Sequence, residues 1–120
     1  MRKPVVLSTL LVLGVFDANA MTIDPQAMAR FDHSYRKCEA KYPQMRGARD
    51  EAYLSMWRAK VDAKSRSDLA AVRNGAAYQA ETRRIGDEET KKGAPPASTI
   101  EAQCQALWAE TLRVRNLAGK

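Results

Sequence analysis

Two cysteines, Cys38 and Cys104, restrict what this chain can fold into more than any other feature of its sequence. In an exported protein an even number of cysteines predicts disulfide bonds, and two cysteines allow one bond. That bond would close a ring of 67 residues. A ring of about that length stabilises a fold by roughly 4 kcal/mol, because it removes entropy from the unfolded chain. The alternative is a pair of free, buried thiols.

The first 20 residues predict export. Arg2 and Lys3 precede an apolar run over 5–16, and the small-x-small sequence Ala-Asn-Ala follows at 18–20. These are the three parts of a secretory signal peptide, and the apolar run is shorter than the roughly 20 residues that span a membrane. We therefore expect a signal peptide over 1–20, cleavage after Ala20, a periplasmic or secreted mature chain and no stable membrane insertion.

The mature chain, 21–120, is expected to form one helical domain with a thin core. Leu, Ile, Val and Phe make up 12 of its 100 residues, which is below the roughly 20% at which disorder becomes an expectation. Two Trp and four Tyr add apolar surface, and frequent Ala favours helix. No stretch alternates apolar and polar residues, so we expect no strand.

The first predicted helix begins at Asp24-Pro25, a capping residue followed by proline at the first helical position. Pro43 ends it. Its apolar positions recur at helical spacing and are Met28, Phe31, Tyr35, Cys38 and Tyr42.

The last predicted helix follows a Pro/Gly linker over 93–97. Ser98 and Glu101 have the spacing of a capping box, in which two side chains satisfy two backbone donors. Its apolar stripe is Ile100, Cys104, Leu107, Trp108 and Thr111. Because Cys38 lies near the end of the first helix and Cys104 near the start of the last, the disulfide predicts that these helices are side by side and antiparallel.

Two further helical segments are expected between them. Asp50 and Glu51 suit the positive end of a helix. The apolar stripe of that helix would be Tyr53, Met56 and Trp57, with Val61 or Lys60 next. A break is expected near 62–65.

The capping sequence Ser65-Arg66-Ser67-Asp68 then predicts another start, followed by a stripe of Leu69, Val72 and Ala76. Asn74-Gly75 either breaks or kinks this segment. The predicted fold is all-α, a compact irregular bundle of four to five short helices.

The sequence contains little that points to catalysis. His33 is the sole histidine, and its neighbours Asp32 and Ser34 would point in other directions on a helix, so they do not form a catalytic triad. There is no Cys-x-x-Cys, histidine pair, aspartate-rich loop or phosphate-binding glycine loop. We expect no enzyme, metal or cofactor. An enzyme would need a pocket that gathers His33 with Glu39 or Asp50.

Binding is the remaining class of function. The mature chain carries a net charge of +5, which suits acidic partner proteins or anionic envelope polymers, although solubility also explains it. Nucleic acid is not expected outside the cytoplasm. The candidate partner-binding patch combines aromatic and basic residues, and its members are Tyr53, Trp57, Arg58, Lys60, Lys64 and Arg66. The alternative is that the aromatic residues are core and the cations a solvated flank.

These observations predict a small exported module that binds an unknown protein, possessing no enzymatic activity and acting as an inhibitor, adaptor or immunity-type protein. The alternative is an envelope-stress or chaperone-like helical protein that shields apolar surfaces. That alternative predicts a dimer with an open apolar face.

Overall fold

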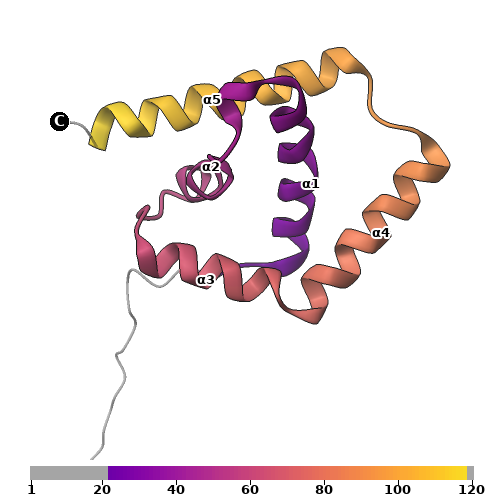
Figure 1. Cartoon of the computed structure of the whole chain (residues 1–120), viewed down its shortest axis with the longest axis horizontal. Helices are drawn as coiled ribbons and strands as arrows, with labels where there is room; N and C mark the ends of the chain where they lie inside the picture. The colour runs from indigo at the N-terminus through magenta and orange to yellow at the C-terminus, as the bar shows by residue number, and fades with distance from the viewer. Residues whose placement is uncertain (1–21, 119–120) are drawn as a thin grey trace, which may run out of the picture.

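The structure is a computed structural model that describes residues 22–118, so the predicted signal peptide lies outside the described residues. Over this range the chain forms five α-helices and one 3-10 turn, and no strand (Figure 1). The all-α prediction is confirmed. The elements are α1 (Pro25–Lys41), η1 (Pro43–Met45), α2 (Arg49–Met56), α3 (Ala63–Arg73), α4 (Ala76–Lys92) and α5 (Ala97–Ala118).

Helix α1 is the central element of the fold. It contacts all the other helices, and its most extensive contact is with α4. Figure 1 shows α2 beside its middle, α3 across its N-terminal end and α5 across its C-terminal end. The helices therefore assemble around α1 as an irregular bundle.

The disulfide between Cys38 and Cys104 is present and joins α1 to α5, with the two Cα atoms 5.5 Å apart. Both cysteines are buried. In Figure 1, α5 passes across the C-terminal end of α1, so the two helices meet at this crossing and do not lie along each other's length. The predicted disulfide is confirmed. The contact between α1 and α5 that accompanies it is confined to this crossing.

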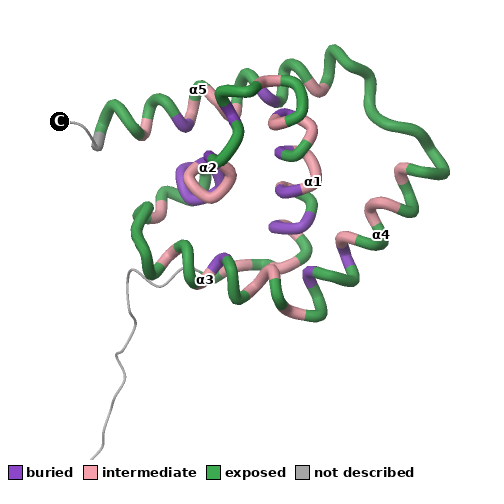
Figure 2. The backbone as a smooth tube through the Cα atoms, in the orientation of Figure 1, coloured by how far each residue is buried: buried purple, intermediate pink, exposed green. Residues whose placement is uncertain are grey.

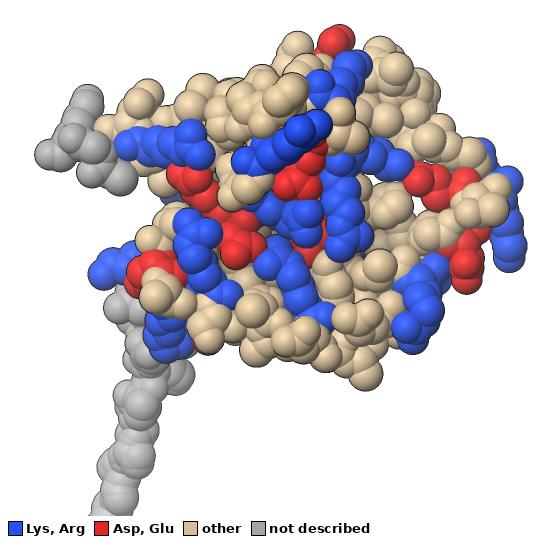
Figure 3. All heavy atoms as spheres, viewed as in Figure 1, with Lys and Arg blue, Asp and Glu red and all other residues tan. Residues whose placement is uncertain are grey.

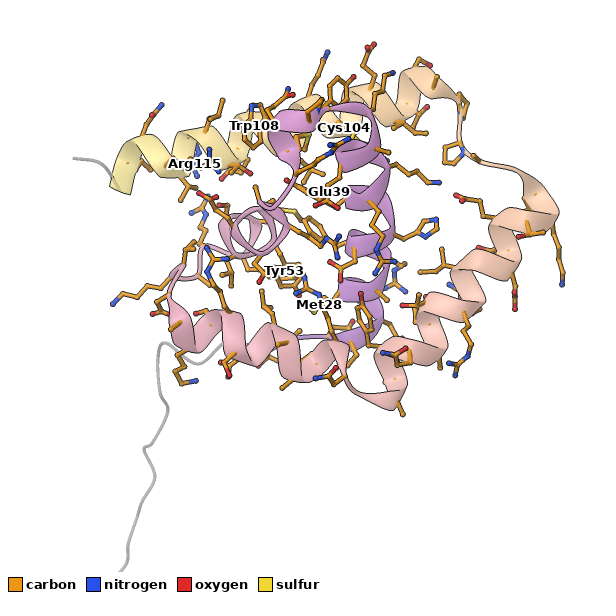
Figure 4. All side chains as sticks on the ribbon, viewed as in Figure 1. Met28, Glu39, Tyr53, Cys104, Trp108 and Arg115 are labelled. Atoms are coloured by element: carbon orange, nitrogen blue, oxygen red, sulfur yellow. A yellow bond between two sulfur atoms is a disulfide. The ribbon has the colours of Figure 1, made fainter. Side chains whose placement is uncertain are left out.

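The core consists of two clusters along α1. The first surrounds the N-terminal half of α1 and contains Met28, Ala29, Tyr53, Leu54, Leu69 and Tyr78. The second surrounds the disulfide and contains Tyr35, Cys38, Met45, Ala52 and Cys104. Phe31 packs against both clusters, with its ring 5.7 Å from that of Tyr35 and 5.3 Å from that of Tyr53. Figure 4 shows Tyr53 and Met28 in the interior between α2 and α1.

Burial is concentrated on α1, α2 and the sides of the other helices that face them (Figure 2). The residues from Thr90 to Thr99, which include the linker, are all exposed. The end of α4, the linker and the beginning of α5 therefore form an arch that contributes little to the core.

Several helix boundaries agree with the sequence analysis. The Asp24 carboxylate accepts a 3.0 Å hydrogen bond from the Gln26 backbone N–H, which caps α1 as predicted. α3 and α4 are separate helices, so the segment at Asn74-Gly75 is a break. Helix α4 ends at Lys92, before Gly93 with φ +86°, a conformation that glycine adopts without strain.

Two helix starts differ from the prediction. α3 begins at Ala63 because the Asp62 carboxylate accepts a 2.9 Å hydrogen bond from the Ser65 N–H, so the cap is Asp62 and not Ser65. α5 begins at Ala97 because the Pro96 carbonyl accepts hydrogen bonds from the first turn, which places Ser98 inside the helix. The predicted capping box is therefore wrong as the start of α5.

Candidate functional site

The C-terminus of α2 contains an arginine at a position that favours glycine. The Ala59 N–H donates to the Leu54 carbonyl at 2.9 Å, and the Arg58 N–H donates to the Ser55 carbonyl at 3.2 Å. These two bonds are the Schellman motif, which ends a helix with one residue in the left-handed conformation. Arg58 is that residue, with φ +54°, and it is the one non-glycine residue with positive φ among the described residues. This conformation costs a non-glycine residue about 1 kcal/mol.

The Schellman turn exposes the apolar residues beside it. Met56 is 48% exposed and Trp57 is 54% exposed. The predicted apolar stripe of this helix is therefore wrong at Met56 and Trp57, and only Tyr53 is buried. For Trp57 the reason is that α2 ends at Met56, so the helical period no longer directs the Trp57 side chain toward the core.

A cleft lies between this turn and the C-terminal half of α5. It has a volume of about 380 Å³, and we name it the α2–α5 cleft. Its lining residues are Ser55, Arg58, Ala59, Arg113, Val114 and Leu117. Leu117 is 58% exposed. The lining of the cleft thus combines apolar side chains with two guanidinium groups.

An ion pair holds α5 in position above α2. The Arg115 guanidinium donates two hydrogen bonds to the Glu51 carboxylate, at 2.7 and 2.8 Å. These bonds lower the pKa of Glu51. Arg115 also lies over the Trp108 ring, 5.1 Å from its centroid, and both residues are on α5 (Figure 4). The packed α2–α5 contact therefore sets the geometry of the cleft.

The two arginines of the cleft differ in their ion pairs. Arg113 donates to Glu110, three residues earlier on α5, at 2.6 and 3.1 Å. Hydrogen bonds from Arg113, and more weakly the nearby charge of Arg58, lower the pKa of Glu110. Within residues 22–118 no carboxylate lies at ion-pair distance from Arg58. Arg58 is therefore the cation of the cleft that is available for a ligand.

The six residues of the predicted binding patch have different surroundings in the structure. Tyr53 is only 2% exposed and belongs to the core, where burial raises its pKa. Lys64 pairs with Asp68 at 3.0 Å, and Arg66 lies 3.9 Å from Asp50. Trp57, Arg58 and Lys60 are exposed, and of the six only Arg58 lines the cleft. Sequence reasoning missed the contribution of α5 to this site. On the face in Figure 3, Lys and Arg side chains are interspersed with Asp and Glu.

A buried polar network was also missed. Asp32 on α1 is fully buried and accepts hydrogen bonds from the Arg73 guanidinium at 2.8 and 3.1 Å and from the Tyr78 hydroxyl. Arg73 also donates to Asp50 on α2 at 2.6 Å. The network thus joins α1, α2, α3 and α4. The sequence did contain a signal for this network. Asp32 lies four residues after Met28, on the predicted buried side of α1, and a buried carboxylate requires a partner.

The pKa values in this network reflect its burial and charge. Burial alone would lower the pKa of Arg73, but the hydrogen bonds to Asp32 and Asp50 outweigh it and raise the pKa. Burial, followed by the hydrogen bond to Asp32, raises the pKa of Tyr78. The Arg73 guanidinium therefore stays charged, and the Tyr78 phenol stays protonated, near neutral pH.

His33 forms part of the contact between α1 and α4. Its Nε2 atom lies 3.2 Å from the Glu89 carboxylate, which also accepts a 2.9 Å hydrogen bond from Lys37. These bonds from Lys37 and His33 lower the pKa of Glu89. His33 is half-buried in this contact.

The carboxylates that a catalytic His33 would need have other partners. Glu39 accepts a hydrogen bond from Arg49 at 2.7 Å, and Asp50 accepts one from Arg73.

Within residues 22–118, no three His, Cys, Asp or Glu side chains come together as metal ligands. None of the described helices is both long and apolar enough to cross a membrane.

Comparison with known proteins adds no relative. No protein-family model, no curated protein and no solved structure matches this chain. The functional interpretation therefore depends on the geometry described above.

Proposed function

We propose that this protein is a small exported module, without enzymatic activity, that binds another protein through the surface at the end of α2. The observation that carries this proposal is the α2–α5 cleft, with Leu117 exposed in it and Arg58 unpaired among the described residues. Arginine and tryptophan are enriched among the residues that dominate the energy of protein interfaces, and apolar side chains around them exclude water. Trp57, immediately before Arg58, adds a large exposed aromatic side chain.

The disulfide supports a location outside the cytoplasm. Cys38 and Cys104 are joined, and disulfides persist in oxidising compartments such as the periplasm or the extracellular space. The signal peptide expected over 1–20 also predicts a location outside the cytoplasm. Export would bring the module into contact with envelope or secreted proteins.

Chemical crosslinking tests the proposed function. Tagged mature protein is mixed with periplasmic or culture-medium extract, crosslinked and purified, and the captured proteins are identified. We expect a specific protein that unlabelled mature protein displaces. Capture of no protein that can be displaced contradicts the proposal.

The chaperone-like alternative has one observation in its favour. Among the residues whose burial the structure describes, five large apolar residues are at least 37% exposed, and they are Met56, Trp57, Val61, Leu112 and Leu117. Light scattering distinguishes the two functions, because shielding through an open apolar face predicts a dimer that suppresses client aggregation. A monomer without that activity favours specific binding.

A further inference from the structure

Arg58 occupies the left-handed position of the Schellman turn at the mouth of the α2–α5 cleft, where glycine would avoid the conformational cost. Departures from local sequence preference occur in proteins mainly at functional or strained sites. A glycine here would end α2 equally well but would provide no charge. The presence of arginine at this backbone position therefore indicates that the Arg58 side chain has a role other than ending α2.

The charge of Arg58 has no carboxylate to pair with among the described residues, whereas Arg113, which also lines the cleft, is paired with Glu110. A guanidinium binds a carboxylate through two parallel hydrogen bonds, which makes arginine the preferred residue for recognising acidic groups. A ligand that brings a carboxylate to Arg58 would therefore complete an ion pair that the protein leaves open.

The apolar residues that line the cleft are Ala59, Val114 and Leu117. Its volume of about 380 Å³ has room for one or two apolar side chains. Covering Leu117, which is 58% exposed, would remove apolar surface from water. The cleft is thus suited to a ligand with an apolar group next to a carboxylate.

We propose that the α2–α5 cleft binds an acidic segment of a partner protein, with one apolar side chain of that segment against Leu117 and Val114 and a neighbouring carboxylate on Arg58. This inference rests on the proposed function and specifies the surface and the chemistry of the partner. Trp57 lies next to Arg58 in the chain and extends the apolar surface that the segment would cover.

Two other occupants fit the charges less well. A second copy of this chain, docked symmetrically, would bring Arg58 of one copy toward Arg58 of the other, and the net positive charge would oppose association. An anionic lipid surface would meet basic residues, but a bilayer is flat and would leave a concave cleft unfilled. A protruding acidic segment satisfies both the charge and the shape.

Synthetic peptides provide the test. An array carries peptides with a central Leu, Phe or Trp flanked by Asp or Glu, and a matched set has Asn or Gln at the flanking positions. We expect mature protein to bind acidic peptides, and the matched amide peptides to bind at least tenfold more weakly. Chemical shifts at Arg58 and Leu117 should move on titration with a bound peptide.

Three variants locate the binding. Arg58→Gly and Leu117→Ser should each weaken peptide binding about tenfold. Lys91→Ala removes the same charge as Arg58→Gly from an exposed position on α4 and should leave binding unchanged. Arg58→Gly should also keep or raise the urea midpoint, because glycine relieves the left-handed conformation, so its loss of binding would not come from unfolding.

Several results would overturn the inference. These are no binding of any acidic peptide, an equal effect of Lys91→Ala, binding to phosphatidylglycerol vesicles but to no peptide, and a dimer that Leu117→Ser disrupts. The proposed function is tested separately by crosslinking. A captured protein whose binding survives Arg58→Gly and Leu117→Ser would leave the proposed function intact and overturn this choice of surface.

Discussion

The guanidinium of Arg73, on α3, holds the fully buried carboxylate of Asp32, on α1, through two hydrogen bonds of 2.8 and 3.1 Å. This pair lies in the interior of a chain that contains few large aliphatic residues. Buried ion pairs do not in general stabilise a protein more than apolar residues would, but removing one partner leaves the other charge without compensation. The network around Asp32 is therefore a position where the fold is sensitive to a change of one atom.

Replacing that carboxylate by an amide tests this sensitivity. Asp32→Asn keeps the size of the side chain and removes the charge that faces Arg73. We expect the free energy of unfolding in urea to fall by about 2–4 kcal/mol, toward the lower end because Arg73 is 21% exposed. Asp68→Asn, which removes the carboxylate of the exposed pair with Lys64, should cost less than about 1 kcal/mol. Equal losses in the two variants would contradict the structural role of Asp32.

The disulfide should contribute a large share of the stability. The Cys38→Ala/Cys104→Ala double variant should lower the free energy of unfolding by roughly 4 kcal/mol, the entropy of closing a loop of about this length. Urea unfolding of the oxidised wild-type protein and of the variant measures the difference. Gel mobility with and without reductant provides the control, because only the wild-type protein should change mobility.

Acid sensitivity should depend on Glu81. The two hydrogen bonds from Arg84, and then the one from Arg30, lower the pKa of the Glu81 carboxyl to about 2 from an ordinary value of 4.5. A lowered folded-state pKa means that the stabilisation is complete above pH 4.5 and is lost as the pH falls from about 4.5 toward 2. Urea midpoints over that range should fall less steeply for Glu81→Gln than for the wild-type protein. Parallel curves would show that Glu81 is not responsible.

Truncation of the two aromatic residues at the end of α2, Tyr53 and Trp57, should cost very different amounts of stability. Tyr53→Ala removes a ring that is only 2% exposed and should cost about 3–5 kcal/mol in the free energy of unfolding. Trp57→Ala removes a ring that is 54% exposed and should cost less than about 1 kcal/mol. Thermal or urea unfolding measures both effects. A large cost at Trp57 would mean that it belongs to the core, as its helical spacing predicted.

The helices were largely predictable from the sequence because their signals are local. Asp24-Pro25 sets the start of α1 through its own hydrogen bond, and the helical spacing of Met28, Tyr35 and Cys38 corresponds to burial. The disulfide was predictable from the number of cysteines alone. Helix starts were less predictable where two capping residues compete, as Asp62 and Ser65 do at α3.

The candidate site was only partly predictable because it depends on contacts between distant segments. Arg58 was part of the predicted patch, but Leu117 joins it from α5, 59 residues later, and no local pattern connects them. The exposure of Trp57 follows from the turn that ends α2, which a continuous helical period does not reveal. Asp32 lay on the predicted buried side of α1, yet its partner Arg73 is 41 residues away on another helix.

The exposed arch between α4 and α5 gives the molecule two covalent routes between its first and last helices. One route is the backbone through Gly93, and the other is the bond between Cys38 and Cys104. A protease that cuts after Lys92 would divide the chain yet release neither piece, because α5 would stay attached through sulfur. A nicked molecule could therefore keep its core and its α2–α5 cleft, and it would separate into fragments only under reducing conditions.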